Sequence, residues 1–391
     1  MRQTARAMAP ATLSVVIAAG GTGGHIYPGL ALAEAIASLA PDTRLSFLGT
    51  PRGLEKALIP GAGHTLHLVD MVPFTGAGRA LLPFALGRAS VQARTVLRAE
   101  GADVAVGMGG YASIPLIAGA RLAGVPSLIH ESGAIPGRAN LLAARLTRRV
   151  ALSFAAAGSH FPVRCELRTV GMPLGPGLAR FDRAALRPTA RSALGVPAGT
   201  KLVLVNGGSQ GAQSLNRLAL GLGRRWRGRD DVAILLKAGA AHHEAVAAEL
   251  SASDGDGAGA GAGAPVVTLT RFIERMDHAY AAADMAVCRA GAGTVAELAV
   301  VGLPAVLVPY PHATADHQSH NAAALVEAGG ALLVADGEAT PDRVGPLLEA
   351  RLDHPDALER MRAGLAGAAH PRAAEELAAW ALELAGAGRG R

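Results

Sequence analysis

Aromatic residues and cysteines are scarce in this chain of 391 residues. Phe, Trp and Tyr together make up 3% of the sequence, which leaves few flat side chains on which nucleic-acid bases could stack. Cys165 and Cys288 are its two cysteines, and they cannot form a disulfide framework or a cysteine-rich zinc site. These shortages disfavour a disulfide-stapled secreted domain and predict a reducing compartment.

Long runs of one charge are also missing. Lys and Arg exceed Asp and Glu by 37 − 31 = 6 residues. This positive balance fits an anionic partner, and nucleic acid, acidic lipid headgroups and a phosphorylated substrate all qualify. Because the arginines are scattered along the chain, nucleic acid is the least favoured of the three, and we expect no nucleic-acid partner.

No run of consecutive apolar residues reaches the roughly 18 that a membrane-spanning helix needs. The apolar stretch Leu13–Ala19 follows Arg2 and Arg6, as the core of a signal peptide would. It runs directly into Gly20, however, without a polar cleavage region. We therefore expect it to be the first β-strand of a cytoplasmic protein.

Short β-branched runs alternate with Ala/Leu-rich amphipathic stretches along the whole chain. This alternation predicts an α/β protein with parallel sheets covered on both faces. The expected strands are 13–19, 44–48, 65–69, 103–107, 126–129, 201–206, 232–236, 266–269, 285–288, 304–309 and 331–334. The expected helices of the first half are 28–40, 81–100, 114–123 and 136–145.

The two halves repeat one pattern of buried strand, Gly-Gly-x-x-Gly turn and helix. The turns begin at Gly20 and Gly207, 207 − 20 = 187 positions apart. The length also suits about two domains. We expect two Rossmann-like domains facing a cleft, with their boundary between Gly171 and Pro188. The predicted divisions are 1–175, 176–371 and a closing helix with its tail at 372–391, and the Gly/Ala repeat 254–264 is expected to be a flexible insertion.

The first motif that carries chemistry reads Gly20-Gly21-Thr22-Gly23-Gly24-His25. Glycines let the backbone approach an oxyanion, and the helix that follows offers free N–H groups and a positive dipole end. The motif is not a P-loop, because no Gly-Lys-Ser/Thr follows it. His25 stands beside this candidate anion site, which favours a functional role over a structural one. The alternative is a turn that only packs the helix against the strand.

The second motif reads Gly207-Gly208-Ser209-Gln210-Gly211-Ala212 and offers the same backbone geometry plus the Ser209 hydroxyl. Two such loops in two domains favour a phosphorylated ligand more than either loop does separately. We expect no cofactor.

A third motif, Arg289–Glu297, opens another helix with small residues. Glu297 lies one turn into this helix, where its carboxylate can accept hydrogen bonds from the vicinal hydroxyls of a ribose. The alternative is that Glu297 only complements the helix dipole. A fourth motif, Asp316–Asn321, places amides after a strand, where they suit the recognition of sugar hydroxyls.

We expect no metal site. The histidines near Asn321 lack a carboxylate and histidine set at ligand spacing. Asp254-Gly255-Asp256 matches a metal-binding Asp-x-Asp pattern, but it lies in the Gly/Ala repeat, away from any predicted strand end. The stretch 72–98 mixes apolar residues with arginines and suits docking on an anionic bilayer, although an ordinary amphipathic helix fits it equally well.

Taken together, the motifs resemble the MurG family of peptidoglycan N-acetylglucosaminyltransferases over nearly the whole chain. The segments that carry the resemblance are Gly20–His25, Gly107–Ser113, His130-Glu131, Pro136-Gly137 with Asn140, Gly207–Asn216, Arg289–Glu297, and Gln318 with Asn321.

The resemblance implies a GT-B fold and a metal-independent, inverting hexosyltransferase. Members of the family transfer GlcNAc from UDP-GlcNAc to the 4-hydroxyl of MurNAc in undecaprenyl-diphospho-MurNAc-pentapeptide. They work as peripheral proteins on the cytoplasmic face of the plasma membrane. The implied partners are therefore UDP-GlcNAc, a polyprenyl-diphosphate-linked acceptor and an anionic inner membrane surface.

The resemblance also implies roles for individual residues. His25 is the candidate base that takes the acceptor proton, and Glu131 is a weaker base or an orienting residue. Gln318 contacts the GlcNAc hydroxyls, and Ile273 lies at the uracil. The residues implied to bind the donor diphosphate and ribose are Gly208, Ser209, Gln210, Ala292, Gly293, Thr294, Val295 and Glu297. Thr22, Gly23 and Gly24 are implied to lie at the sugar and the acceptor diphosphate. The implied substrate-binding residues further include Tyr111, Asn140 and Asn321.

The sequence departs from the family pattern at two positions of the donor site. Gly133 stands where the family usually has an Asn, and Gly175 stands where it usually has an Arg. Each lost polar contact is often worth about 0.5 to 3 kcal/mol. The alternatives are compensation by other residues, a paralogue that glycosylates another polyprenyl phosphate, or a weakly catalytic UDP-sugar-binding protein.

Overall fold

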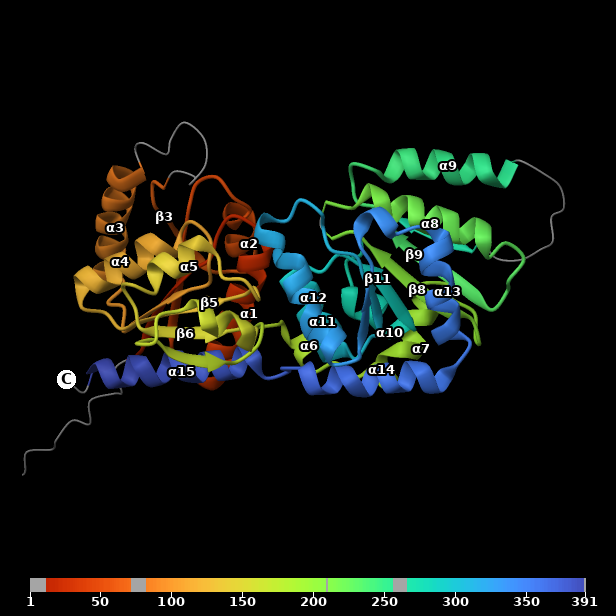
Figure 1. Ribbon diagram of the computed structural model, residues 1–391. Coiled ribbons are helices and arrows are strands. Elements are labelled where there is room, and N and C mark those ends of the chain that lie inside the picture. The colour runs from red at the N-terminus through yellow and green to blue at the C-terminus, as the bar shows by residue number, and fades with distance from the viewer. Residues whose placement is uncertain (1–11, 72–81, 209, 256–265, 390–391) are drawn as a thin grey trace, which may run out of the picture. The chain divides into compact units, whose positions relative to one another are not determined.

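The computed structural model describes residues 12–71, 82–208, 210–255 and 266–389 (Figure 1). The chain forms two compact units. The first runs from Met1 to Gly175 and also takes in Arg372–Arg391, and the second runs from Pro176 to Pro371. The C-terminal segment thus returns to the first unit, and each unit is considered by itself below.

The first unit contains a parallel sheet of seven strands in the order β3-β2-β1-β4-β5-β6-β7. Every neighbouring pair in it is parallel. The strands are β1 (Ser14–Ala18), β2 (Arg44–Gly49), β3 (Thr65–Leu68), β4 (Val104–Gly107), β5 (Ser127–Glu131), β6 (Arg149–Leu152) and β7 (Glu166–Thr169).

Helices cover both faces of this sheet (Figure 1). They are α1 (Gly23–Leu39), α2 (Glu55–Gly61), α3 (Leu82–Ala99), α4 (Ser113–Ala123), α5 (Arg138–Ala143), the 3-10 helix η2 (Ala155–His160) and α15 (Ala373–Arg389). The central strand β1 shows why two layers are needed. Val15 and Ile17 pack into the core beneath α1 and α15, whereas Val16 and Ala18 pack on the opposite side against α3 and α4.

The returning helix α15 is held to the first unit by a stripe of apolar side chains. Leu377, Trp380, Ala381 and Leu384 follow the spacing of one helical face and are buried. The guanidinium carbon of Arg168 lies 4.2 Å from the centre of a Trp380 ring, which adds a cation–π contact.

The second unit contains a parallel sheet of six strands in the order β10-β9-β8-β11-β12-β13. The strands are β8 (Lys201–Asn206), β9 (Val232–Lys237), β10 (Val267–Thr270), β11 (Met285–Cys288), β12 (Ala305–Leu307) and β13 (Ala331–Leu333). The longer helices are α7 (Arg183–Ala193), α8 (Gln213–Arg225), α9 (His243–Gly255), α11 (Ala292–Val301), α12 (His317–Glu327), α13 (Pro341–Leu352) and α14 (Pro355–Ala368). The shorter ones are α6 (Pro176–Ala179), α10 (Met276–Ala282), η3 (Thr314–Asp316) and η4 (Asp336–Glu338).

The predicted α/β class with parallel sheets is confirmed, and each expected strand lies within about two residues of an observed one. The expected helix from Pro28 instead begins at Gly23, so Pro28 lies inside α1. Helix α9 reaches Gly255, the second residue of the expected flexible insertion, and the rest of that insertion lies outside the described residues, as does 72–81 of the stretch considered for membrane docking. Among the helices that the structure describes, none has the length and apolarity needed to cross a membrane.

Candidate active site

The glycine-rich loop after β1 lies where the strand order of the first sheet reverses. The chain runs outward from β1 through β2 to β3 and then continues on the other side of β1 with β4. In open α/β sheets, ligands bind outside the carboxyl ends of the strands at this point. The loops that follow β1 and β4 are Gly20–His25 and Gly107–Tyr111, both of which the sequence motifs singled out.

These two loops pack against each other so closely that glycine is required. A methyl group on Gly110 would lie 2.6 Å from the carbonyl oxygen of Gly20, and one on Gly109 would lie 2.7 Å from Cδ2 of His25. Gly109 and Gly110 also have φ values of 96° and 76°, in the left-handed region. The second loop therefore fixes the position of the His25 ring.

His25 occupies the first turn of α1 and is partly buried. Burial lowers its pKa below the usual 6.5, and the nearby carbonyl of Gly20 opposes this shift. The ring is therefore neutral at pH 7. Nδ1 is buried and has no hydrogen-bond partner among the described residues. Because Nδ1 is buried, Nε2 is the nitrogen through which this ring would act as a base.

The other first-loop residues lie beside His25. Thr22 is the N-cap of α1, and Gly23 and Gly24 form its first turn. Thr22 and Gly24 are exposed, and Tyr111 of the neighbouring loop is 36% exposed. The start of a 17-residue helix thus presents backbone N–H groups to solvent at the reversal point, as an anion site requires.

A buried carboxylate that the sequence motifs did not reveal supports the first loop from behind. Glu55, at the start of α2, is 0% exposed. Its Oε2 accepts the N–H of Gly21 at 3.0 Å, and its Oε1 accepts the N–H and the hydroxyl of Thr50 at 3.0 and 2.8 Å. Methyl groups on Gly20 and Gly49 would come within 2.8 and 2.9 Å of this side chain. Several neighbouring glycines therefore make room for Glu55.

Glu131 ends β5 and is 3% exposed. Its carboxylate accepts the N–H groups of Gly133 and Gly137 at 2.8 and 3.1 Å and the side-chain amide of Asn140 at 2.9 Å. Burial raises the pKa of Glu131, and these hydrogen bonds oppose the shift. A carboxylate that accepts from two backbone N–H groups of the following loop and from Asn140 of α5 suits the orienting role better than that of a base.

Asn140 is 4% exposed, and its amide also donates to the carbonyl oxygen of His130 at 2.9 Å. Its Oδ1 is buried and has no hydrogen-bond partner within the described part of the chain. A direct contact between Asn140 and substrate would therefore have to use Oδ1. The substrate-binding role of Asn140 stays a prediction.

The two departures from the family pattern have different surroundings. A methyl group on Gly133 would approach the carbonyl oxygen of Ile135 to 3.0 Å, so a side chain there requires a small shift of the loop. Within the described chain, nothing lies within 4 Å of the corresponding position on Gly175. A larger residue could therefore be accommodated at Gly175 without rearrangement of its neighbours.

The second sheet reverses its order between β8 and β11, and the same rule applies. The loops that follow these strands are Gly207–Gly211 and Arg289–Gly291. Asn206 Oδ1 accepts the N–H of Gly208 at 3.0 Å and Lys237 Nζ donates to the Gly208 carbonyl at 3.2 Å, so the loop is held on both sides. Within this loop, Ser209 lies outside the described residues and Gln210 is exposed.

Helix α11 begins at Ala292, directly after the β11 loop. Ala292, Gly293 and Thr294 form its first turn, whereas Val295 is 1% exposed and donates its N–H to the Gly291 carbonyl at 3.0 Å. Val295 therefore supports this turn from the core. Ile273 is partly exposed in the loop between β10 and α10.

Glu297 has a partner that the sequence did not suggest. The hydroxyl of Tyr280 donates to its Oε2 at 2.6 Å, and the Tyr280 side chain is buried in the core. Burial raises the pKa of Glu297, while the Tyr280 hydrogen bond and the charge of Lys237 oppose the shift. The carboxylate is thus fixed by one oxygen, which leaves the other for a diol.

Gln318 and Asn321 on α12 brace the loop before α11. Gln318 Oε1 accepts the N–H groups of Ala290 and Tyr310 at 3.2 and 2.9 Å, and Asn321 donates to the carbonyl of Ala290 at 3.1 Å. Asn321 is 1% exposed, so its direct contact is with the loop. The amide nitrogen of Gln318 is not used in these bonds and can donate to a sugar hydroxyl.

Arg289, the first residue of the third motif, also belongs to a polar network with two residues that the motifs did not indicate. It contacts Asp336 Oδ1 at 2.6 Å and Ser214 Oγ at 3.0 Å, and Ser214 also donates to Asp336 at 2.6 Å. This polar triad ties the β11 loop to α8 and η4. Within the described residues, no three His, Cys, Asp or Glu side chains gather as a metal site would require.

Apart from Ser209, which lies outside the described residues, the predicted residues lie toward the carboxyl edges of the two sheets, in two sets that belong to separate units. Residues 15–152 match the glycosyltransferase family 28 N-terminal domain, and residues 202–377 match the glycosyltransferase family 28 C-terminal domain. The fold and the loops therefore define a glycosyltransferase.

Curated relatives narrow this class. The UDP-N-acetylglucosamine--N-acetylmuramyl-(pentapeptide) pyrophosphoryl-undecaprenol N-acetylglucosamine transferase of Rhodococcus erythropolis is 40% identical over 95% of both chains. Its counterpart in Saccharopolyspora erythraea is 42% identical over 97% of this chain and 96% of its own. The crystal structure of Acinetobacter baumannii MurG is 29% identical, with a TM-score of 0.75 over 95% of this chain and 99% of its own. The chain belongs to the MurG family, which confirms the resemblance and the GT-B fold class drawn from the sequence.

Proposed function

We propose that this protein transfers GlcNAc from UDP-GlcNAc to the 4-hydroxyl of MurNAc in undecaprenyl-diphospho-MurNAc-pentapeptide. Membership of the MurG family supports this reaction, because the curated relatives carry its name over nearly their whole length. The structural observation that carries the proposal is the position of His25, a neutral imidazole held at the reversal point of the first sheet.

In the proposed mechanism, the first unit binds the acceptor and the second binds the donor. Nε2 of His25 takes the proton of the acceptor hydroxyl as its oxygen attacks the anomeric carbon of GlcNAc. The bond from that carbon to the diphosphate oxygen breaks, and its electron pair leaves with UDP. Attack opposite the leaving group inverts the anomeric centre and gives a β-linked disaccharide.

The leaving UDP is stabilised by backbone dipoles and not by a metal ion in this proposal. The N–H of Gln210 and the N–H groups of the first turn of α11 are the donors. Glu297 accepts hydrogen bonds from the ribose diol, Ile273 lies against the uracil, and Gln318 donates to a hydroxyl of GlcNAc. Such preorganised donors act best where charge develops on the diphosphate.

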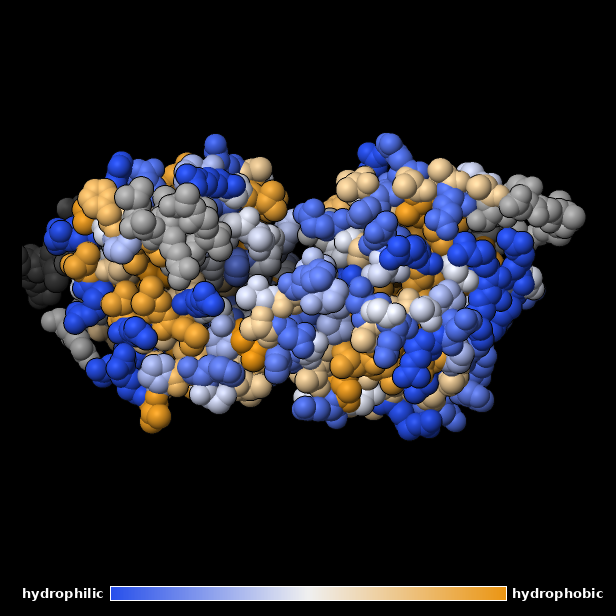
Figure 2. Space-filling model, turned by 45° about the horizontal axis from the view of Figure 1, so that its top comes forward, coloured by the Kyte–Doolittle hydropathy of each residue, from blue (hydrophilic) through white to orange (hydrophobic). Residues whose placement is uncertain are grey.

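We further propose that the protein works as a peripheral enzyme on the anionic cytoplasmic face of the plasma membrane. Phe84 and Val91 on α3 are 77% and 55% exposed, and Arg88 on the same helix is largely exposed in an ion pair with Asp70 at 2.9 Å. The face of the first unit seen in Figure 2 carries a broad apolar area bordered by hydrophilic residues. Apolar side chains with neighbouring arginines favour binding to acidic lipid.

The test offers the full chain UDP-GlcNAc with a short-chain lipid acceptor in the presence of EDTA. Mass spectrometry then detects the disaccharide lipid, and coupled UDP release gives the rate. We expect product with UDP-GlcNAc and little with UDP-glucose or UDP-GalNAc. Turnover only with another sugar or lipid would favour a paralogue, a reading that Gly133 and Gly175 motivate. UDP binding without turnover of any donor would reduce the protein to a UDP-sugar-binding role.

A further inference from the structure

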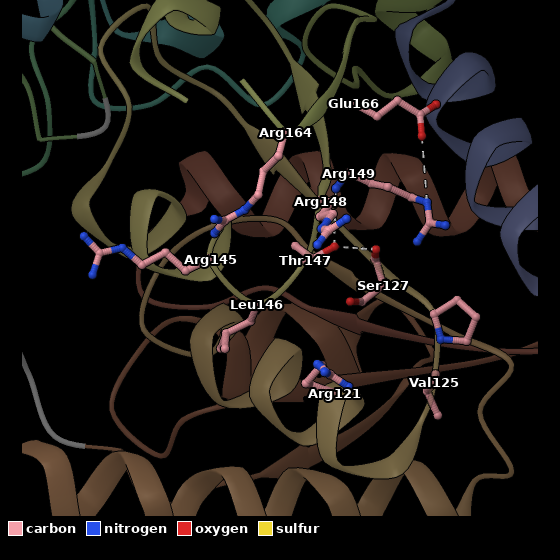
Figure 3. Close-up of a pocket in the computed structure, with 11 residues that line it drawn as sticks. Arg121, Val125, Ser127, Arg145, Leu146, Thr147, Arg148, Arg149, Arg164 and Glu166 are labelled. Atoms are coloured by element: carbon pink, nitrogen blue, oxygen red, sulfur yellow. Dashed lines mark hydrogen bonds and ion pairs between the residues drawn. The ribbon is translucent and has the colours of Figure 1, made fainter. Parts of the chain in front are cut away.

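A second polar feature of the first unit is a pocket of about 760 Å³ that the proposed reaction does not use (Figure 3). Its wall is rich in arginine and holds a single acidic side chain. The charged residues that line it are Arg121, Arg145, Arg148, Arg149, Arg164 and Glu166.

The pocket lies at the edge of the sheet opposite the catalytic loops. Ser127, Arg149 and Glu166 are the first residues of β5, β6 and β7, so the pocket opens at the amino ends of these strands. The loop that holds His25 follows the carboxyl end of β1 in the same parallel sheet. A ligand bound here would therefore be separate from the reacting groups.

The positive charge of the pocket is only slightly compensated. Glu166 contacts Arg168 at 2.6 Å and Arg149 at 3.9 Å, and in Figure 3 Arg149 turns toward Glu166. Arg121, Arg145, Arg148 and Arg164 have no carboxylate within 4.0 Å among the described residues. By contrast, the arginines of α7 surround Asp284 and bond to neighbouring carbonyls.

The floor of the pocket is held by a hydrogen bond that involves none of these arginines. Thr147 is buried and donates its hydroxyl to the carbonyl of Ser127 at 2.7 Å, a bond that links the loop before β6 to the start of β5. This bond fixes the base of the segment that carries Arg145 and Arg148. The guanidinium groups therefore extend from a defined surface.

We propose that this pocket binds a phosphate-bearing anion with at least two negative charges. Guanidinium groups match phosphate oxygens in pairs and keep their charge at every physiological pH. A volume of about 760 Å³ suits a ligand of the size of a diphosphate ester. The arginines are largely exposed, so binding should weaken steeply with added salt.

The phosphate has two possible sources, a soluble diphosphate and a lipid headgroup. Leu122 and Leu146, which follow Arg121 and Arg145 in the sequence, are 56% and 39% exposed. Apolar side chains beside the arginines could contact the acyl region if the phosphate belongs to a lipid. Both sources share the same phosphate chemistry, and the experiment separates them.

Cys165 provides a local reporter of occupancy. It lies between Arg164 and Glu166, is partly exposed, and is a free thiol, whereas Cys288 is buried. Burial raises the pKa of the Cys165 thiol, and the charges of Arg164 and Arg148 oppose this shift. An anion that neutralises these arginines should raise the pKa further and slow alkylation of Cys165.

The experiment measures alkylation of Cys165 in the full chain by mass spectrometry at low salt, with inorganic diphosphate in one arm. The other arm uses phosphatidylcholine vesicles with or without phosphatidic acid. The test variant is Arg148→Gln/Arg164→Gln. The control, Arg343→Gln/Arg360→Gln, removes the same charge from exposed sites of the second unit. Each variant is compared with and without ligand, because the test substitutions themselves alter the thiol.

We expect the ligand to slow alkylation at least about threefold in the wild type and the control, and its affinity to fall about tenfold in the test variant. Slowing by diphosphate assigns the site to a soluble ligand, and slowing by phosphatidic acid vesicles alone assigns it to a lipid headgroup. No slowing in either arm, or equal affinities in the test and control variants, would overturn the proposal.

Discussion

The backbone N–H of Gly21 donates to Oε2 of Glu55 at 3.0 Å, across 34 positions of sequence. The contact joins the first glycine loop to a carboxylate that is fully buried beneath it. Because the loop carries His25 four residues later, Glu55 is a positioning residue for the proposed base. It does not contact the reacting atoms in the proposed mechanism.

Glu55→Gln tests this role. The amide can still accept from Thr50 through its oxygen, but its NH₂ group then faces the N–H of Gly21. One partly buried donor loses its acceptor, which should cost about 1 kcal/mol of unfolding free energy and lower kcat more than it raises KM. Urea unfolding and steady-state kinetics measure the two effects. Glu34→Gln, an exposed change on α1, serves as the control. A kcat like that of the control would remove Glu55 from positioning the loop.

His25→Gln should lower turnover about 100-fold or more if Nε2 takes the acceptor proton. The wild-type rate should be constant through neutral pH and fall in acid. Burial lowers the pKa of His25, so the ring becomes protonated only below the ordinary value of 6.5. The pH dependence of kcat measures this limb. An acid limb that survives unchanged in His25→Gln would assign the base to another group.

The lowered pKa of His130 predicts that the free energy of unfolding of the protein decreases in mild acid. Burial lowers its pKa to about 4, against the carbonyl of Gly171, which its Nε2 meets at 3.0 Å. Below about pH 6.5 the unfolded chain binds a proton that the folded chain does not, so stability falls as the pH decreases toward 4 and changes little above 6.5. The total effect is about 3 kcal/mol when the pH falls below 4.

Urea unfolding at pH 7.0 and pH 5.0 measures the effect, and His130→Gln provides the comparison. Its side-chain amide can replace Nε2 as a donor to Gly171 but does not titrate. The variant should lose less stability than the wild type between the two pH values. An equal loss in both proteins would assign the pH dependence to other groups, of which His25 is the first to examine.

The glycine loops could be predicted from sequence because each follows a buried strand directly and lies within one short segment. Glu55 could not, since its donors lie in two other loops and no local pattern links them. The strands β6 and β7 were not predicted from the sequence either. β7 lies at the edge of the sheet, and its residues Glu166–Thr169 are mostly exposed, so they lack an apolar run.

Gln318 illustrates the same limit within the second unit. Its amide after a strand indicated a sugar contact, and that expectation is compatible with its amide nitrogen, for which the described residues provide no hydrogen-bond partner. Its oxygen, however, accepts two backbone N–H groups 8 and 28 positions away. Side chains that brace a loop and side chains that bind a ligand have the same polar types, so only the packed structure separates these uses.

Tyr280→Phe tests whether Glu297 is oriented for the ribose of the donor. The hydroxyl of Tyr280 holds Oε2 of Glu297 at 2.6 Å, and its removal leaves the carboxylate without that donor. The loss of one hydrogen bond to a charged group, about 1.5 kcal/mol, should raise the KM for UDP-GlcNAc about tenfold with a smaller effect on kcat. A donor that lacks the 2′-hydroxyl provides the control, because it cannot use the oriented carboxylate fully. With this donor, wild type and Tyr280→Phe should differ much less. The same penalty with both donors would mean that Tyr280 supports only the fold, and Glu297 would lose its proposed role at the ribose.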